Sequence, residues 1–468
     1  RDLVRSRGLG DVYKRQIMIS EKSFYKTFAL LTLSLALQNL LTYGVNLADN
    51  LMLGSYSETA LSGSALCNQI QFFLQMLVVG ASEGAVVMGT QYFGKGRFEP
   101  IVHTIGTAVR FGGGIAAVMF LLILFFPGQI LGLLTNDAAV IAEGVKYLQI
   151  ICFTYLMFTV TNILTASLRS VGIVKIGYII SASTLILNII LNSCLIYGNF
   201  GFPELGIRGA AVATLCSRTV ELLIVIWYLK YKEHSLNLTL KKLVFIDRSY
   251  IRDYKRTALP VLTSQAQWGL AQMAQTGVLG HLGAPAIAAN SIATIVFQII
   301  TVVVYGSASA SGIMIGWTIG EGKEKNIKPM VKTLEILFLS IGILSGLAIF
   351  LIREPVLSLY QISPQAKALS MQFMAILSVT TVGTAYQMSC DNGIIRGGGN
   401  TSFSMKMNLI SMWLILLPIS IFAAFVLHLS PIIVFFLLKW DQLYKAIPVF
   451  IRLHRWKWIT KVTREEAA

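Results

Sequence analysis

Charged residues are scarce in this chain of 468 residues. They make up 13% of the sequence, whereas 55% of the residues are hydrophobic and the mean hydropathy is +0.69. A soluble globular domain carries about 25% charged residues, so the composition excludes an ordinary cytosolic enzyme, a disordered chain and a disulfide-stapled secreted module. A membrane-spanning helix takes about 20 apolar residues, and the length accommodates twelve of them without room for a large soluble domain. The sequence therefore predicts an all-α integral membrane protein.

Motifs of metal binding and catalysis are also lacking. The five cysteines lie in apolar segments without ligand-type spacing, so we interpret them as small hydrophobic residues. The chain has no P-loop motif for nucleotide hydrolysis and no histidine pair at metal-ligand spacing. Residues 80–84 fit the G-x-S-x-G pattern of hydrolases, but that chemistry needs a strand–turn–helix elbow, and these residues lie inside an apolar run. We therefore predict a protein that is not an enzyme and that holds neither a cofactor nor a metal.

The apolar runs between charged or Pro/Gly-rich breaks predict twelve membrane spans. They lie near residues 27–53, 61–92, 104–126, 139–165, 177–199, 208–229, 257–280, 286–319, 333–352, 368–394, 407–428 and 431–452. The last run is the weakest, because Lys439, Asp441 and Lys445 interrupt it. Residues 1–16 are polar and basic and precede Met18, so we interpret them as a non-native leader.

The positive charge is distributed unevenly between the two sides of these spans. Most of the 38 Lys and Arg residues lie in the terminal segments and in alternate loops, and the opposite loops hold Lys146, Arg208, Arg353 and Lys367. Short loops rich in Lys and Arg stay in the cytoplasm, so we predict an inner (plasma) membrane protein with both termini cytoplasmic. The net charge of +16 is then a signal of topology, and the predicted partners are the lipid bilayer and small molecules rather than nucleic acid.

Self-comparison shows an internal repeat with a nearly constant offset. Adding 226 to the residue number aligns Leu53 with Leu279, Gly54 with Gly280, Gly80 with Gly306 and Gly94 with Gly320, and adding 227 aligns Arg169 with Arg396 and Gly172 with Gly399. The predicted organisation is a leader (1–16), a six-helix lobe (17–229), a cytoplasmic linker (230–256), a second six-helix lobe (257–452) and a cytoplasmic tail (453–468). Transporters built from such parallel repeats bind their substrate between the two halves.

Ionisable residues inside the spans indicate function, because each is costly unless it meets a cavity or a partner. Asp49 lies in the first span, and the repeat replaces it with Gln275, so the fold does not require a carboxylate there. A buried carboxylate is readily neutralised, so Asp49 can take up a proton or a sodium ion and release it. Glu83 and Asp391 are candidates for binding a cationic substrate, with close helix packing as the competing interpretation for Glu83. Whether Arg110 pairs with such an acid stays open.

Two ionisable pairs and two groups of amides complete the polar inventory of the spans. Arg218 with Glu221 and Asp441 with Lys445 are one helical turn apart and can neutralise each other. The amides are Asn188 and Asn192 on one face of span five, and Gln265, Gln267, Gln272 and Gln275 in span seven. Ligand binding and hydrogen bonding between helices are both open as roles for these amides.

Six sequence segments in this order resemble the multidrug and toxic compound extrusion (MATE) family. They are ADNLMLG at 48–54, QYFGKG at 91–96, LRSVG at 168–172, LNIILN at 187–192, GIRGAAVAT at 206–214 and RGGGNT at 396–401. The resemblance extends over about residues 27–463. It implies two six-helix lobes around a central V-shaped cavity, and proton- or sodium-driven export of amphipathic, often cationic compounds.

The resemblance also implies roles for individual residues. Asp49 would carry the coupling ion, completed by Asn188, Asn192 and Thr214, and the substrate cavity would include Glu83, Gln265, Gln272, Gln275 and Asp391. The chain departs from the family in three places: Asn192 replaces an Asp of many relatives, Ser34 replaces a Pro, and span seven has Gln and Trp268 where some relatives have a coupling Glu. Because of these departures, few other residues of the spans could carry the coupling ion in place of Asp49.

The function predicted from these features is a monomeric secondary antiporter that exports amphipathic cations in exchange for H⁺ or Na⁺. A flippase for lipid-linked precursors or a polysaccharide exporter of related fold is the alternative, and it would require more Lys and Arg inside the spans. A scaffold or sensor that does not transport is the third interpretation.

Overall fold

The computed structural model describes residues 21–464 except 234–235, 237, 239–247 and 361. All regular elements among these residues are helices, which confirms the all-α prediction. The first half contains α2 (Lys22–Tyr56), α3 (Glu58–Gly94), α4 (Glu99–Phe125), α5 (Pro127–Gly132), α6 (Ala138–Ile151), α7 (Thr154–Ser170), α8 (Lys175–Tyr197), η1 (Asn199–Gly201) and α9 (Ile207–Tyr231). The second half contains α11 (Arg248–Gly280), α12 (Ala284–Gly320), η2 (Glu324–Asn326), α13 (Ile327–Ser358), α14 (Pro364–Met388), η3 (Ser389–Ile395), α15 (Thr401–Asn408), η4 (Leu409–Leu416), α16 (Leu417–Phe425), α17 (Pro431–Lys439), α18 (Asp441–Tyr444) and α19 (Ala446–His454).

The helices account for the twelve predicted spans. Within the described part of the chain, nine helices are individually long and apolar enough to cross a membrane, and the bent pair of α6 and α7 makes a tenth span. The seventh span is α11, which carries four glutamines, and the twelfth is the short series α17, α18 and α19. The predicted leader and residues 234–235, 237 and 239–247 of the predicted linker lie outside the described residues.

Four spans depart from a straight α-helix. The fourth span bends by 53° between α6 and α7. The tenth continues from α14 into the π-helical η3, and the eleventh is π-helical over η4. Such π-helical turns are rare inside helices and often occur at functional sites. The twelfth span is broken near the charged residues that interrupt its sequence.

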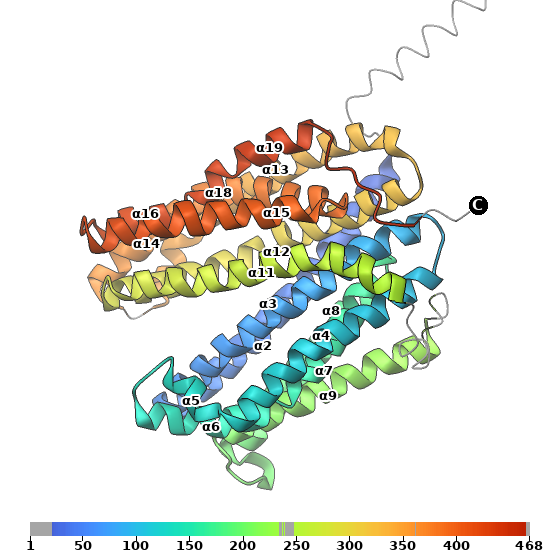
Figure 1. The fold of residues 1–468 in the computed structure, drawn as a ribbon. Helices are drawn as coiled ribbons and strands as arrows, with labels where there is room; N and C mark the ends of the chain where they lie inside the picture. The colour runs from blue at the N-terminus through green and yellow to red at the C-terminus, as the bar shows by residue number, and fades with distance from the viewer. Residues whose placement is uncertain (1–20, 234–235, 237, 239–247, 361, 465–468) are drawn as a thin grey trace, which may run out of the picture.

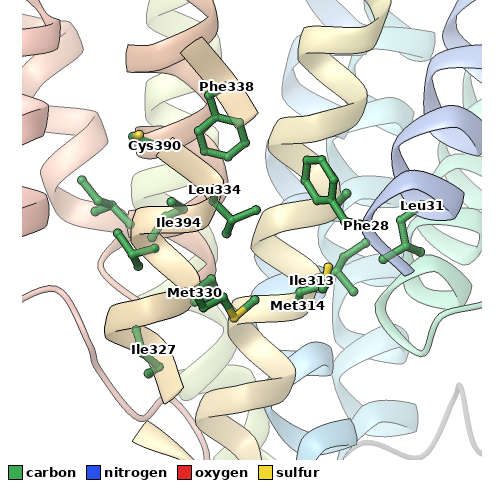
Figure 2. Packing of buried hydrophobic residues seen from close by; sticks show 14 of the residues in the cluster. Phe28, Leu31, Ile313, Met314, Ile327, Met330, Leu334, Phe338, Cys390 and Ile394 are labelled. Atoms are coloured by element: carbon green, nitrogen blue, oxygen red, sulfur yellow. The ribbon is translucent and has the colours of Figure 1, made fainter. Parts of the chain in front are cut away.

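The two halves form two lobes that meet at one end of the molecule and diverge toward the other (Figure 1). The chain begins and ends, as far as it is described, at the end where the lobes meet. A continuous apolar cluster joins the lobes there, with Phe28 and Leu31 of α2 packed among Ile313 of α12 and Leu334 of α13 (Figure 2). Burial of this surface, at roughly 25 cal/mol per Å² if water would otherwise reach it, holds this end of the molecule closed.

The contact between the lobes is symmetric in the way that the sequence repeat predicts. Helix α3 approaches α11 at Gly80, where an added Cβ would lie 2.5 Å from Leu262 Cα. Helix α12 approaches α2 at the equivalent Gly306, where a Cβ would lie 2.5 Å from the Thr32 carbonyl oxygen. On the axis between these crossings Gly94 and Gly320 face each other, each 2.9 Å from the Cβ that the other would carry. The repeated glycines therefore permit the close approach of the lobes.

Candidate functional site

The first lobe brings together Asp49 of α2, Asn188 and Asn192 of α8 and Thr214 of α9. The i,i+4 spacing of the two asparagines places both on the face of α8 that packs against α2. The hydroxyl of Tyr197, at the end of α8, donates to the Met52 carbonyl oxygen at 2.8 Å and so ties α8 to the last turns of α2. The local fold therefore fixes Asp49 beside the asparagines.

A chain of side-chain hydrogen bonds connects these residues. Asn192 Nδ2 donates to Asp49 Oδ1 at 2.5 Å and to Asn188 Oδ1 at 3.1 Å. Asn188 Nδ2 in turn donates to Thr214 Oγ1 at 3.4 Å. Asp49 is 9% exposed and both asparagines are fully buried. The four residues that the resemblance assigned to the coupling ion are therefore adjacent, although their role stays a prediction.

The charge of Asp49 is not neutralised by a hydrogen-bonded cation. Its hydrogen-bond donor is the neutral amide of Asn192. Arg218 of α9 acts on Asp49 electrostatically, but its guanidinium donates to Glu221 Oε2 at 2.6 Å. A buried carboxylate without a cationic partner is unfavourable in a membrane protein. This site can therefore gain stability by taking up a proton or a small cation.

The oxygens of the site suit a small hard cation. Carboxylate, amide and hydroxyl oxygens are the ligands that such cations prefer, and Asp49, Asn188, Asn192 and Thr214 present only these. The buried Asn192 Oδ1 has no hydrogen-bond donor, so an ion or a proton on Asp49 would satisfy it. In the described residues no group of three or more His, Cys, Asp or Glu side chains could hold a metal ion.

Tyr147 of α6 also belongs to this site, and the sequence did not indicate it. Its ring is 3% exposed, and its hydroxyl lies beside Thr214 and interacts electrostatically with Asp49. A single tyrosine in an apolar run is an ordinary core residue, so the only available signal was its polar hydroxyl.

Of the five residues predicted to line a substrate cavity, the two acids are linked through Arg396, which interacts electrostatically with both Glu83 and Asp391. Glu83 of α3 accepts a hydrogen bond from Arg169 of α7. Asp391 of η3 accepts from Ser404 Oγ at 2.7 Å and interacts electrostatically with Arg396. The sequence did not indicate these arginine partners, which occupy equivalent positions of the repeat.

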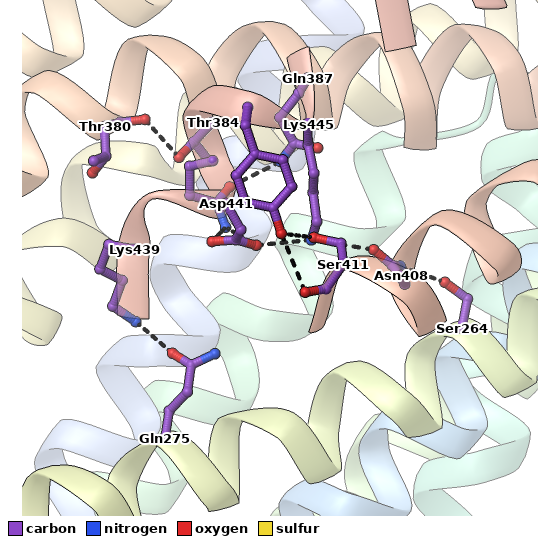
Figure 3. A network of polar contacts seen from close by, with 12 residues as sticks. Ser264, Gln275, Thr380, Thr384, Gln387, Asn408, Ser411, Lys439, Asp441 and Lys445 are labelled. Atoms are coloured by element: carbon purple, nitrogen blue, oxygen red, sulfur yellow. Dashed lines mark hydrogen bonds and ion pairs between the residues drawn. The ribbon is translucent and has the colours of Figure 1, made fainter. Parts of the chain in front are cut away.

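The three glutamines of α11 that were predicted to line the same cavity also differ from one another. Gln265 and Gln272 are partly buried, whereas Gln275 is buried. Gln275 Oε1 accepts from Lys439 Nζ at 3.1 Å, inside the second lobe (Figure 3). Gln275 therefore belongs to a polar network of the second lobe, and the role of these residues in a substrate cavity stays a prediction.

Two lobes related by a parallel repeat, with an unneutralised acid buried in one of them, define a multi-pass membrane transporter and not an enzyme. The MatE family model matches residues 34–194 and 260–444. The chain therefore belongs to the MatE family, the family that its sequence segments resemble.

The relatives agree with this assignment. The chain is 29% identical over 384 residues to the probable multidrug resistance protein NorM of Thermotoga maritima, with 82% of each chain covered. It is 26% identical over 407 residues to the uncharacterized transporter YisQ of Bacillus subtilis, with 84% of this chain and 87% of that one covered. A crystal structure of a variant of the Vibrio cholerae MATE transporter VcmN superimposes with a TM-score of 0.83 at 18% identity, covering 92% of this chain and 97% of that one. The last similarity confirms the fold of two six-helix lobes.

Proposed function

We propose that this protein is a secondary antiporter of the plasma membrane that exports amphipathic, cationic drugs or toxic metabolites in exchange for H⁺ or Na⁺. The coupling ion binds at Asp49 with Asn188, Asn192 and Thr214 around it. Both termini face the cytoplasm, and the monomer is the working unit. The names of the relatives, which are probable multidrug resistance proteins, favour this class of substrate.

The observation that carries the proposal is the state of Asp49. It is buried, and its hydrogen-bond donor is a neutral amide. An ion that neutralises the carboxylate removes the desolvation cost of burying it. Loading and unloading of the site therefore change the stability of the packing of α2 against α8. This change supplies the differential binding that a coupled conformational change requires.

The arrangement of the lobes supports alternating access with the outer side open. The lobes meet at the end where the described chain begins and ends, and they diverge away from it (Figure 1). With the termini in the cytoplasm, Asp49 lies near the outer end of α2, where an external ion reaches it. Closing the outer end and separating the cytoplasmic end would then carry the ion inward.

A cationic substrate would bind to the remaining acids and amides of the spans. It would compete with Arg169 for Glu83, and with Ser404 and Arg396 for Asp391. Gln265 and Gln272 offer amides on α11. Each acid can release the substrate because the arginine competes with the substrate for the carboxylate. When the substrate leaves, the arginine pairs with the acid again.

Efflux in proteoliposomes tests the proposal. Purified protein is reconstituted, proton and sodium gradients are imposed separately, and export of a fluorescent amphipathic cation is measured for the wild type and for Asp49→Asn. One of the gradients should drive export by the wild type and not by Asp49→Asn. The exposed acid of α13 provides the matched control Glu354→Gln, which should behave as the wild type. Equal gradient-driven export by Asp49→Asn and the wild type would refute the proposed coupling site.

A further inference from the structure

The segment 456–464, which follows α19, crosses from the second lobe to the first at the end where the lobes meet (Figure 1). The side chain of Gln91, near the end of α3, binds the backbone of this segment on two sides. Gln91 Nε2 donates to the Thr460 carbonyl oxygen at 3.1 Å, and Gln91 Oε1 accepts from the Val462 amide at 3.0 Å. An amide side chain thus pairs with the segment as a neighbouring strand would.

Two further residues of the first lobe hold the end of the segment. Tyr92 Oη accepts from the Arg464 amide at 3.3 Å. Lys95 Nζ donates to the Arg464 carbonyl oxygen at 3.3 Å. All four hydrogen bonds from Gln91, Tyr92 and Lys95 go to backbone atoms, so they fix the path of the segment rather than one of its side chains.

The second lobe anchors the same segment more firmly. Trp458 is fully buried, and its Nε1 donates to the Leu453 carbonyl oxygen at 2.8 Å. The Thr460 amide donates to the Gly398 carbonyl oxygen at 2.7 Å. A Cβ on Gly398 would lie 2.2 Å from the Trp458 ring, so the segment packs here only against glycine. The equivalent position of the first half is Val171.

The repeat places a second cross-lobe contact opposite the first. Trp317 of α12 occupies the position equivalent to Gln91, and its Nε1 donates to the Ser170 carbonyl oxygen of the first lobe at 2.8 Å. Both contacts flank the close approach of Gly94 and Gly320. In one direction α12 therefore reaches the first lobe directly. At the equivalent position of α3, the Gln91 side chain bonds to the second lobe through the segment 456–464.

We propose that the segment 456–464 is a latch that holds the cytoplasmic ends of the lobes together and must leave α3 before they separate. Trp458 and α19 keep the segment attached to the second lobe, so it moves with that lobe. Separation then breaks the bonds to Gln91, Tyr92 and Lys95 while those to Gly398 persist. The inference rests on the proposed function only in requiring that the lobes move.

A cysteine introduced at a buried position of α3 can report the separation of the lobes. Thr90 is fully buried against Gly316, where an added Cβ would lie 2.1 Å from Thr90 Oγ1. The Thr90→Cys thiol is therefore shielded while the lobes are in contact and reacts with a maleimide when they part. The parent carries Cys216→Ser, because Cys216 is exposed and the other four cysteines are buried. When opening and closing are fast, the labelling rate follows the open population.

Removing the bonds between the latch and α3 should raise this rate. Gln91→Ala removes two hydrogen bonds, and we expect labelling about tenfold faster than in the parent. Tyr92→Phe removes one bond and keeps the buried ring, so the expected increase is about threefold. The matched control is Lys461→Ala, because the Lys461 ammonium pairs with Glu324 of the same lobe at 3.0 Å. That variant should label at the parental rate.

Unchanged labelling in folded Gln91→Ala and Tyr92→Phe would overturn the latch. So would an equal increase in Lys461→Ala, because it would show general loosening of the second lobe. The labelling assay needs neither substrate nor gradient. If gradient-driven export fails while the latch variants label faster, the proposed function is wrong and the latch stands.

Discussion

The two lobes differ at the positions that the repeat relates to the Asp49 site. In the first lobe the Asp49 carboxylate receives a hydrogen bond from the neutral amide of Asn192. In the second lobe the equivalent residue is Gln275, and it receives a hydrogen bond from the ammonium group of Lys439 at 3.1 Å. At equivalent positions, the first lobe thus has the acid Asp49 without a hydrogen-bonded cation, and the second lobe has the neutral Gln275 bound to the cation Lys439.

The second lobe has a buried acid on its last span instead. Asp441 occupies the position equivalent to Thr214, and its Oδ2 lies 2.8 Å from Lys445 Nζ (Figure 3). The two side chains are 2% and 3% exposed. Gln442 donates to both oxygens of Asp441 at 3.2 Å, and Lys445 also reaches Asn408. The Asp441 carboxylate is therefore neutralised by a residue of its own lobe, whereas the Asp49 carboxylate has a neutral hydrogen-bond donor.

Neutralising the buried acid should destabilise the second lobe much more than the first. Asp441→Asn leaves Lys445 buried without its counter-charge, and removing one partner of a buried ion pair costs about 3–5 kcal/mol. Asp49→Asn removes an acid that has no hydrogen-bonded cation, so the free energy of unfolding should change by less than about 1 kcal/mol. Denaturant-induced unfolding of both variants in one detergent measures the contrast.

The double variant Asp441→Asn, Lys445→Met provides the control for this contrast. Removing both charges should restore most of the stability, because no unpaired charge is left. A similar loss in Asp49→Asn and Asp441→Asn would show that the two lobes do not differ in the way described.

Sodium should stabilise the first lobe if it is the coupling ion. A ligand present at 100 times its dissociation constant stabilises the folded state by about 2.7 kcal/mol. The melting temperature of the wild type should then rise with NaCl and not with choline chloride at equal ionic strength, and Asp49→Asn should show no such rise. A wild type that is insensitive to sodium but requires a proton gradient for export would assign H⁺ to the site. An equal rise in Asp49→Asn would place the sodium elsewhere.

Composition, hydropathy and the repeat were sufficient to predict the fold. The repeated glycines Gly94 and Gly320 lie where the lobes approach each other, which the sequence analysis did not predict. The bend of 53° between α6 and α7 was not predicted, because no proline marks it. The docking of residues 456–464 was missed as well. The charged residues near the end of the chain suggest a segment in contact with water. The glycines at 397–399, where the segment packs, were the one available signal of this contact.

The candidate site was predicted only in part. The repeat drew attention to Asp49 by replacing it with Gln275, and the family segments supplied Asn188, Asn192 and Thr214. The partner of Glu83 was not predictable, because Arg169 lies on another helix 86 residues away and sequence spacing predicts pairs only within one helix. Spacing within one helix did predict the ion pairs of the last span of each lobe. These pairs are Arg218 with Glu221 and Asp441 with Lys445.

Among the two ion pairs, the smaller effect should come from Arg218, which the repeat relates to Lys445. Its pair with Glu221 resembles that of Lys445 with Asp441, but the side chains are 15% and 13% exposed. Partial solvation weakens the pair and also reduces the cost of leaving one charge alone. We expect Arg218→Gln to lower the free energy of unfolding by about 1 kcal/mol, compared with about 3–5 kcal/mol for Lys445→Gln, measured side by side by denaturant unfolding. Equal losses would mean that water reaches the two ion pairs equally. Asp49 would then be the remaining difference in buried charge between the two lobes.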